Sequence, residues 1–185
     1  MSTTRFDPIL IGPVGAGKTS ISAILSKALD VPHVEYDAHR LAYFQELGFD
    51  MDVNLALHAR EGWPTMYRYW KVFSPYAIER LLAEHTGVLD LGGGAVVCEH
   101  IEVLHRLRAA FAPFPNVVLL RPYPDLEQSL TLLNERTQAG EDLQRNNRAF
   151  LSHPSFEELA KITVHTQTRT PEEVTAEVLQ RLVRA

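Results

Sequence analysis

Short runs of apolar residues alternate along the chain with longer segments whose apolar residues recur at helical spacing. The short runs, each of which predicts a buried strand, are residues 7–12, 33–36, 87–91, 117–120 and 162–165. The segments that predict helices are residues 18–29, 38–47, 53–60, 64 or 66 to 84, 99–111, 124–138, 155–160 and 171–183. Strands and helices in this alternation form a parallel sheet covered on both faces. The pattern predicts a single domain over residues 1–185, a three-layer α/β/α fold with a five-stranded parallel sheet.

Two segments depart from this regularity. Residues 51–84 carry a cluster of large aromatic side chains, which favours a helix packed on the core over a substrate clamp. Residues 139–153 are polar, contain asparagine and show little periodicity, so we expect a mobile loop there.

The junction of the first strand and first helix reads Gly12-Pro13-Val14-Gly15-Ala16-Gly17-Lys18-Thr19-Ser20, the G-x-x-x-x-G-K-T pattern of a phosphate-binding loop. Glycines let backbone N–H groups turn inward around a polyphosphate, and the following helix adds its positive N-terminal end. Lys18 would supply a charge for the β- and γ-phosphates, and the Thr19 hydroxyl would ligate Mg²⁺. The sequence thus predicts ATP and Mg²⁺ as cofactors, bound through Gly12, Gly15, Ala16, Gly17, Lys18, Thr19 and Ser20.

Further candidates fall at the ends of predicted strands, where ligands of parallel sheets bind. Asp37 is the candidate acid/base and positioning group, although it could simply cap the next helix. Glu35, two residues earlier, would belong to the Mg²⁺ shell if the strand is regular. The run Gly92-Gly93-Gly94 predicts the floor of a substrate pocket, or only a tight turn. Asp90 could be a second magnesium residue, but strand parity could also turn it away from the site.

Basic residues form two groups, each of which could instead be solvated surface cations. Arg68 and Lys71 lie about one helical turn apart and could face an anionic substrate. Arg136, Arg145 and Arg148 surround the expected loop, from which an arginine could close on the transferring phosphoryl group.

Composition narrows the function further. The formal net charge is −5 and the isoelectric point near 5.9, which argues against a broad nucleic-acid surface. The single cysteine, Cys98, rules out an intramolecular disulfide and suits a reducing cytosol. There is no signal segment, long apolar run or zinc-type histidine spacing, so we expect a cytoplasmic protein without membrane partners.

Together, the phosphate loop, Asp37 and the Gly92-Gly93-Gly94-Ala95-Val96 run resemble the shikimate kinase family, as do Phe156–Ala160 and Thr166–Val174 near the C-terminus. The resemblance implies an ATP- and Mg²⁺-dependent kinase that phosphorylates a hydroxyl of a small metabolite. It implies that Asp37 holds the substrate hydroxyls, that Gly93 and Gly94 line the same pocket, and that Arg145 or Arg148 contacts ATP from a lid. Arg136 would lie near the adenine, which the turn from Arg169 to Pro171 would border.

The chain departs from the family pattern where the substrate carboxylate is bound. Arg68 and Lys71 compete for one family arginine within a substrate segment at about 38–85, and Ser152 stands where a second arginine is expected. We therefore expect shikimate to be a poor acceptor. The alternatives are a gluconate- or nucleotide-type kinase on the same fold, or a regulatory protein that binds ATP without turnover. We expect a monomer or weak homodimer.

Overall fold

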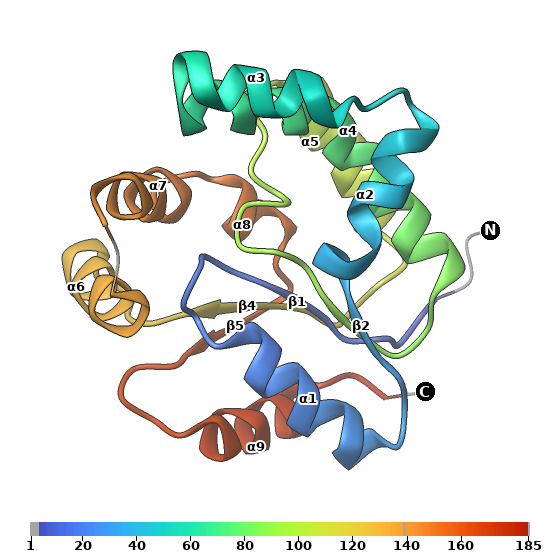
Figure 1. The fold of residues 1–185 in the computed structure, drawn as a ribbon. Coiled ribbons are helices and arrows are strands. Elements are labelled where there is room, and N and C mark those ends of the chain that lie inside the picture. Colours follow the sequence, from blue (N-terminus) through green and yellow to red (C-terminus); the bar gives the residue numbers. More distant parts are fainter. Residues whose placement is uncertain (1–3, 139, 185) are drawn as a thin grey trace.

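The computed structural model describes residues 4–138 and 140–184, and five parallel strands lie at its centre (Figure 1). The strands are β1 (Ile9–Ile11), β2 (His33–Glu35), β3 (Val88–Asp90), β4 (Val117–Arg121) and β5 (Ile162–His165). Their order in the sheet is β2-β3-β1-β4-β5. This confirms the predicted five-stranded parallel sheet. The register pairs Glu35 with Asp90, so the last residues of β2 and β3 lie side by side.

Nine helices are assigned among the described residues: α1 (Lys18–Leu29), α2 (Tyr36–Glu46), α3 (Met51–Glu61), α4 (Trp63–Glu84), α5 (Ile101–Phe111), α6 (Leu126–Thr137), α7 (Glu141–Leu151), α8 (Ser155–Leu159) and α9 (Pro171–Arg181). Helices α1 and α9 cover one face of the sheet, and α2, α4 and α5 lie over the other (Figure 1). Along β1, Ile9 and Ile11 enter one hydrophobic core while Leu10 enters the other. This alternation follows from the pleat of a strand that is buried on both faces.

The segment expected to be a loop is helical: α7 occupies Glu141–Leu151, and Ala139 lies outside the described residues. Its burial is confined to a few positions, including Asn147, Phe150 and Leu151, which are each at most 5% exposed. The two apolar neighbours separate, because Phe150 packs into the core that contains Ile9 and Leu151 into the core that contains Leu10. The buried and half-buried positions share one face, because residues 143, 147, 150 and 151 recur at helical spacing, which the expectation of a loop overlooked.

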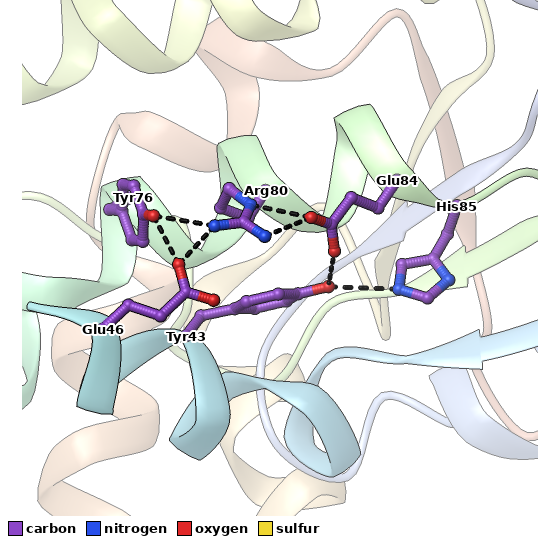
Figure 2. A network of polar contacts seen from close by, with 6 residues as sticks. All are labelled: Tyr43, Glu46, Tyr76, Arg80, Glu84 and His85. Carbon is purple, nitrogen blue, oxygen red and sulfur yellow. Dashed lines mark hydrogen bonds and ion pairs between the residues drawn. The ribbon is translucent and has the colours of Figure 1, made fainter.

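Helices α2 and α4 pack closely and are joined by a polar network shown in Figure 2. The Tyr43 hydroxyl donates to Glu84 Oε2 (2.8 Å) and lies 3.1 Å from His85 Nε2. Arg80 pairs with Glu84 and with Glu46, and the remaining member, Tyr76, also contacts Glu46. Single exposed pairs of this kind contribute little, but the shared network fixes the orientation of the two helices.

The aromatic cluster serves two purposes. The rings of Phe44, Phe49, Tyr69 and Phe73 pack against one another at centroid distances of 5.2–5.6 Å, as expected for a helix on the core. Other rings of α4 instead line a cavity, described below. Pro75 lies inside α4 without ending it.

Candidate active site

The phosphate loop joins β1 to α1. Lys18 is buried, and its ammonium donates to the carbonyls of Gly12 and Pro13, both at 3.0 Å. Burial lowers the pKa of Lys18, while the negative charges of Asp90 and Asp37 oppose that shift. The loop therefore holds a desolvated cation beside two carboxylates, and a phosphate would compensate its charge.

A hydroxyl and two carboxylates meet next to this cation. Thr19 Oγ1 donates to Asp90 Oδ2 at 2.8 Å, and burial raises the pKa of Asp90 against the influence of Lys18 and Thr19. Glu35, paired with Asp90 across the strands, lines the same cavity of about 320 Å³. The sequence left open whether the strand turns Asp90 away from the site. In the structure its carboxylate faces the phosphate loop. Hydroxyl and carboxylate oxygens are the ligands that Mg²⁺ prefers, so these residues fit that ion.

Asp37 lies in the first turn of α2, just beyond β2, and lines the same cavity. The glycine run approaches it closely: a Cβ at Gly92 would lie 3.0 Å from both carboxylate oxygens of Asp37. A Cβ at Gly93 would lie 2.4 Å from Val14 Cγ2 in the phosphate loop. Only a residue without a side chain permits this contact. The structure thus brings together the three strand ends that the sequence singled out.

A second cavity of about 220 Å³ continues from Asp37 and the glycine run into the space between α2 and α4. Rings dominate its lining, which includes Tyr36, Trp63, Tyr67, Trp70 and Phe150. We call it the acceptor cavity. The acceptor cavity adjoins the cavity at the phosphate loop, since Val14, Asp37, Gly92 and Gly93 line both.

Lys71 lines the acceptor cavity, but its ammonium is engaged by the glycine run. It donates to the Gly94 and Ala95 carbonyls and lies 4.8 Å from the centre of the Tyr67 ring. The Tyr67 hydroxyl also donates to the Gly94 carbonyl, at 2.9 Å. Burial lowers the pKa of Lys71 to about 7. Lys71 therefore supports the pocket floor.

Arg68 does not line the acceptor cavity, so its predicted contact with the acceptor stays a prediction. Its guanidinium donates to Thr65 Oγ1 at 2.9 Å, and the residue lines a neighbouring cavity of about 270 Å³ beside α5, which shares Lys71, Ser74 and Ala95 with the acceptor cavity. The reason is its angular position on α4, one residue beyond Tyr67. The cation that lines the acceptor cavity from α2 is Arg40, which the sequence analysis missed. Its spacing of three residues from Asp37 was the available signal.

The other side of the phosphate loop opens on a cavity of about 280 Å³. Gly15, Ala16, Gly17 and Ser20 line it together with Arg136, Arg169 and Pro171. Arg136 donates to Thr166 Oγ1 (3.3 Å) and the Gln167 carbonyl, and Arg169 to Glu177 (2.6 Å). The residues expected to border a nucleotide base thus lie beside the loop. Gly12 instead packs against β4, where a Cβ would lie 2.3 Å from the Leu120 carbonyl oxygen.

The arginines of α7 lie outside these three cavities. Arg148 forms a bidentate ion pair with Glu127 of α6, with N–O distances of 2.7 and 2.9 Å. Arg145, almost one turn earlier on α7, does not line the cavities either. Ser152 is the exposed C-cap residue of α7. Catalytic roles for Arg145 and Arg148 stay predictions that would require α7 to move.

Comparison with known proteins identifies the family. A family model described as shikimate kinase matches residues 14–183. The chain belongs to the shikimate kinase family. It is accordingly an ATP-dependent small-molecule phosphotransferase. No curated protein matches its sequence.

Solved structures share the fold at low identity. The chain resembles a shikimate kinase from Acinetobacter baumannii in complex with shikimate (TM-score 0.64, 20% identity, 94% of this chain and 90% of that one). It also resembles shikimate kinase from Aquifex aeolicus (0.60, 18%, 95% and 95%) and a gluconokinase from Sinorhizobium meliloti (0.58, 19%, 96% and 93%). Within the described residues, no helix combines the length and apolar character needed to cross a membrane.

Proposed function

We propose that this kinase transfers the γ-phosphoryl group of Mg²⁺-bound ATP to a hydroxyl of a small metabolite held in the acceptor cavity. The observation that carries the proposal is that the two cavities adjoin at Asp37, Gly92 and Gly93, which line both. A hydroxyl held by Asp37 would lie close to a phosphate bound by the loop, because Asp37 and Lys18 line the same cavity. Phosphoryl transfer depends mainly on such positioning and on charge neutralisation.

The residues divide this work between them. Lys18 and the loop N–H groups would bind the β- and γ-phosphates, and Thr19, Asp90 and Glu35 would hold Mg²⁺ directly or through water. The ion supplies neutralisation of phosphate charge. Asp37 orients the acceptor hydroxyl and accepts its proton.

The base of the nucleotide would lie between Arg136, Arg169 and Pro171. Arg145 and Arg148 would reach ATP only after α7 moves, which for Arg148 means leaving Glu127. Such lid movements commonly accompany nucleotide binding in phosphotransferases.

The acceptor differs from shikimate in this proposal. Ser152 is uncharged, Arg68 lies outside the acceptor cavity, and Lys71 already donates to two backbone carbonyls of the pocket floor. Aromatic rings fill much of the lining instead. A carboxylate at the place of the family arginines would therefore lack compensating partners, so shikimate should bind weakly.

An ATP-consumption screen tests the proposal, with shikimate, gluconate, nucleoside monophosphates and neutral polyols as acceptors. We expect turnover with some small alcohol and little with shikimate, and no turnover in Lys18→Ala. Nucleotide binding without turnover of any acceptor would favour the regulatory alternative. Efficient shikimate phosphorylation would reject the acceptor assignment, and a preference for gluconate would favour the gluconate-type alternative. Cytoplasmic location, a monomer or weak homodimer, and the absence of nucleic-acid partners stay predictions.

A further inference from the structure

Arg40 is an unusual cation because it is enclosed within the acceptor cavity. Its guanidinium carbon lies 4.3 Å from the centre of the Trp70 ring, and its Nε lies 2.9 Å from Asp37 Oδ1. The Arg40 side chain is only 20% exposed, whereas that of Asp37 is 64% exposed. Stacking on a flat ring fixes the guanidinium plane and leaves its N–H groups directed sideways.

Two donors of this cavity wall, Arg40 Nε and the Tyr36 hydroxyl, form no hydrogen bond among the described residues. The contact with Asp37 lacks hydrogen-bond geometry, and Arg40 Nε is a buried donor without a hydrogen-bond partner among the described residues. The Tyr36 hydroxyl is in the same situation, since the neighbouring Ser74 hydroxyl donates to the Trp70 carbonyl (3.1 Å). Burial raises the pKa of Tyr36 to about 12, so it is a neutral donor. The charge of Arg40 is compensated by the ion pair with Asp37, but a ligand would add the hydrogen bonds that Arg40 and the Tyr36 hydroxyl lack.

A purely structural role explains these facts less well. An ion pair at i,i+3 on a helix surface needs neither enclosure over a tryptophan nor a neighbouring unpaired phenol. Lys71, the other cation of the cavity, already donates to two carbonyls of the glycine run. Arg40 therefore remains as the cavity cation able to receive an anion, and its planar fork matches carboxylate and phosphate oxygens.

We propose that Arg40 is the specificity-determining residue for the acceptor, and that it binds an anionic group located next to the hydroxyl that becomes phosphorylated. This inference rests on the proposed function. Since the guanidinium contacts Asp37, which holds the hydroxyl, an anion on its free edge lies about 5 Å from the Asp37 oxygens. That span suits a compact hydroxy acid or phosphorylated alcohol, with one or two carbon atoms between the two groups. An acceptor with a remote anion cannot reach both residues.

Binding can be measured without turnover, because the chain has two tryptophans, Trp63 and Trp70, and both line the acceptor cavity. Tryptophan fluorescence is titrated with D-glycerate, glycerol 3-phosphate, glycerol and 6-hydroxyhexanoate. These probes carry an adjacent carboxylate, an adjacent phosphate, no anion and a remote carboxylate. We expect D-glycerate or glycerol 3-phosphate to bind at least about tenfold more tightly than the other two, and the better of them identifies the anion.

Three variants separate binding from structure. Arg40→Gln should lose about tenfold or more in affinity for the adjacent-anion probes while glycerol binding stays unchanged. Arg40→Lys, which keeps the charge without the fork, should lose less. Arg68→Gln is the matched control, an arginine outside the acceptor cavity, and should bind like the parent. Stabilisation of Arg40→Gln by ATP against heat checks that the variant is folded.

The outcomes distinguish this inference from the proposed function. Affinities of D-glycerate and glycerol 3-phosphate that both equal that of glycerol, no saturable response to either anionic probe, or equal losses in Arg40→Gln and Arg68→Gln would overturn the role of Arg40. Phosphorylation of neutral alcohols would still support the kinase in that case. Conversely, Arg40-dependent anion binding without phosphoryl transfer to any acceptor would leave the anion site standing and remove the proposed reaction.

Discussion

The two cavities that meet at Asp37 are built in different ways. On the nucleotide side, one stretch from Gly12 to Ser20 supplies the cation, the hydroxyl and most of the backbone donors, and it is polar. On the acceptor side, the lining comes from α2, α4, α7 and the glycine run, and it is largely aromatic. The residues that bind the nucleotide are therefore largely contiguous in the sequence. The choice of acceptor depends instead on side chains that only the tertiary structure brings together.

The largest expected effect lies on the nucleotide side. Lys18→Ala removes the cation that the loop encloses, and we expect phosphoryl transfer to fall by about 10²-fold or more with every acceptor. Heat stabilisation by ATP should fall as well, because a ligand stabilises only as far as it binds. Steady-state kinetics and thermal unfolding with ATP check both expectations. Unchanged turnover would show that the loop does not bind the nucleotide.

The carboxylates beside Thr19 allow a sharper comparison within that side. Asp90→Asn should raise the Mg²⁺ concentration needed for half-maximal rate by about tenfold, because Asp90 contacts Thr19 directly. Glu35→Gln, whose side chain is more exposed, should raise it less. Magnesium titrations of the two variants test the order. The reverse order would assign the ion to Glu35, as the sequence alone suggested.

A milder change isolates the acceptor side. Tyr67→Phe removes the hydroxyl that donates to the Gly94 carbonyl but leaves the ring in place. One such hydrogen bond contributes about 1 kcal/mol, so the acceptor KM should rise several-fold while ATP stabilisation stays unchanged. Weaker ATP binding in this variant would show that the two sides are not separable.

The last effect concerns stability and pH and leaves the reaction itself aside. The pKa of Lys71 is lowered to about 7 by burial, whereas a lysine of the unfolded chain titrates near 10.4. Between these values the unfolded state binds more protons, so this residue makes the protein more stable as pH rises from about 7. Chemical unfolding of the parent and Lys71→Met at pH 7, 8 and 9 measures this slope, at most about 1.4 kcal/mol per pH unit. Equal slopes in the two proteins would contradict the burial of a destabilised ammonium.

The same contrast explains what could be predicted from the sequence. The five strands and the phosphate loop have local signals, since apolar runs and glycine spacing act over a few residues. The sequence of β3 alone could not show which side of the sheet the Asp90 side chain occupies. That depends on the strand register, which pairs Asp90 with Glu35. Arg40 looks like any polar residue of an amphipathic helix until Trp70, thirty residues later, is placed beneath it.

The structure of α7 was missed for a related reason. Its sequence is mainly polar, and its narrow stripe of buried and half-buried residues at 143, 147, 150 and 151 includes an asparagine, which obscures the helical spacing. Helix formation there depends on tertiary packing, which cannot be predicted from the local sequence alone.

The separation of Phe150 and Leu151 into opposite cores has a consequence for temperature. If α7 lifts when no ligand is bound, both side chains leave apolar surroundings together, and the opening carries a positive heat capacity change. Apolar contacts weaken on cooling, so the lifted state becomes relatively easier to populate in the cold. Limited proteolysis within 141–151 should then show that addition of nucleotide and acceptor protects the segment, with the closed fraction falling between 25 and about 5 °C. Phe150→Ala should reduce that temperature dependence. Cleavage that is equal with and without ligands would remove α7 as a lid.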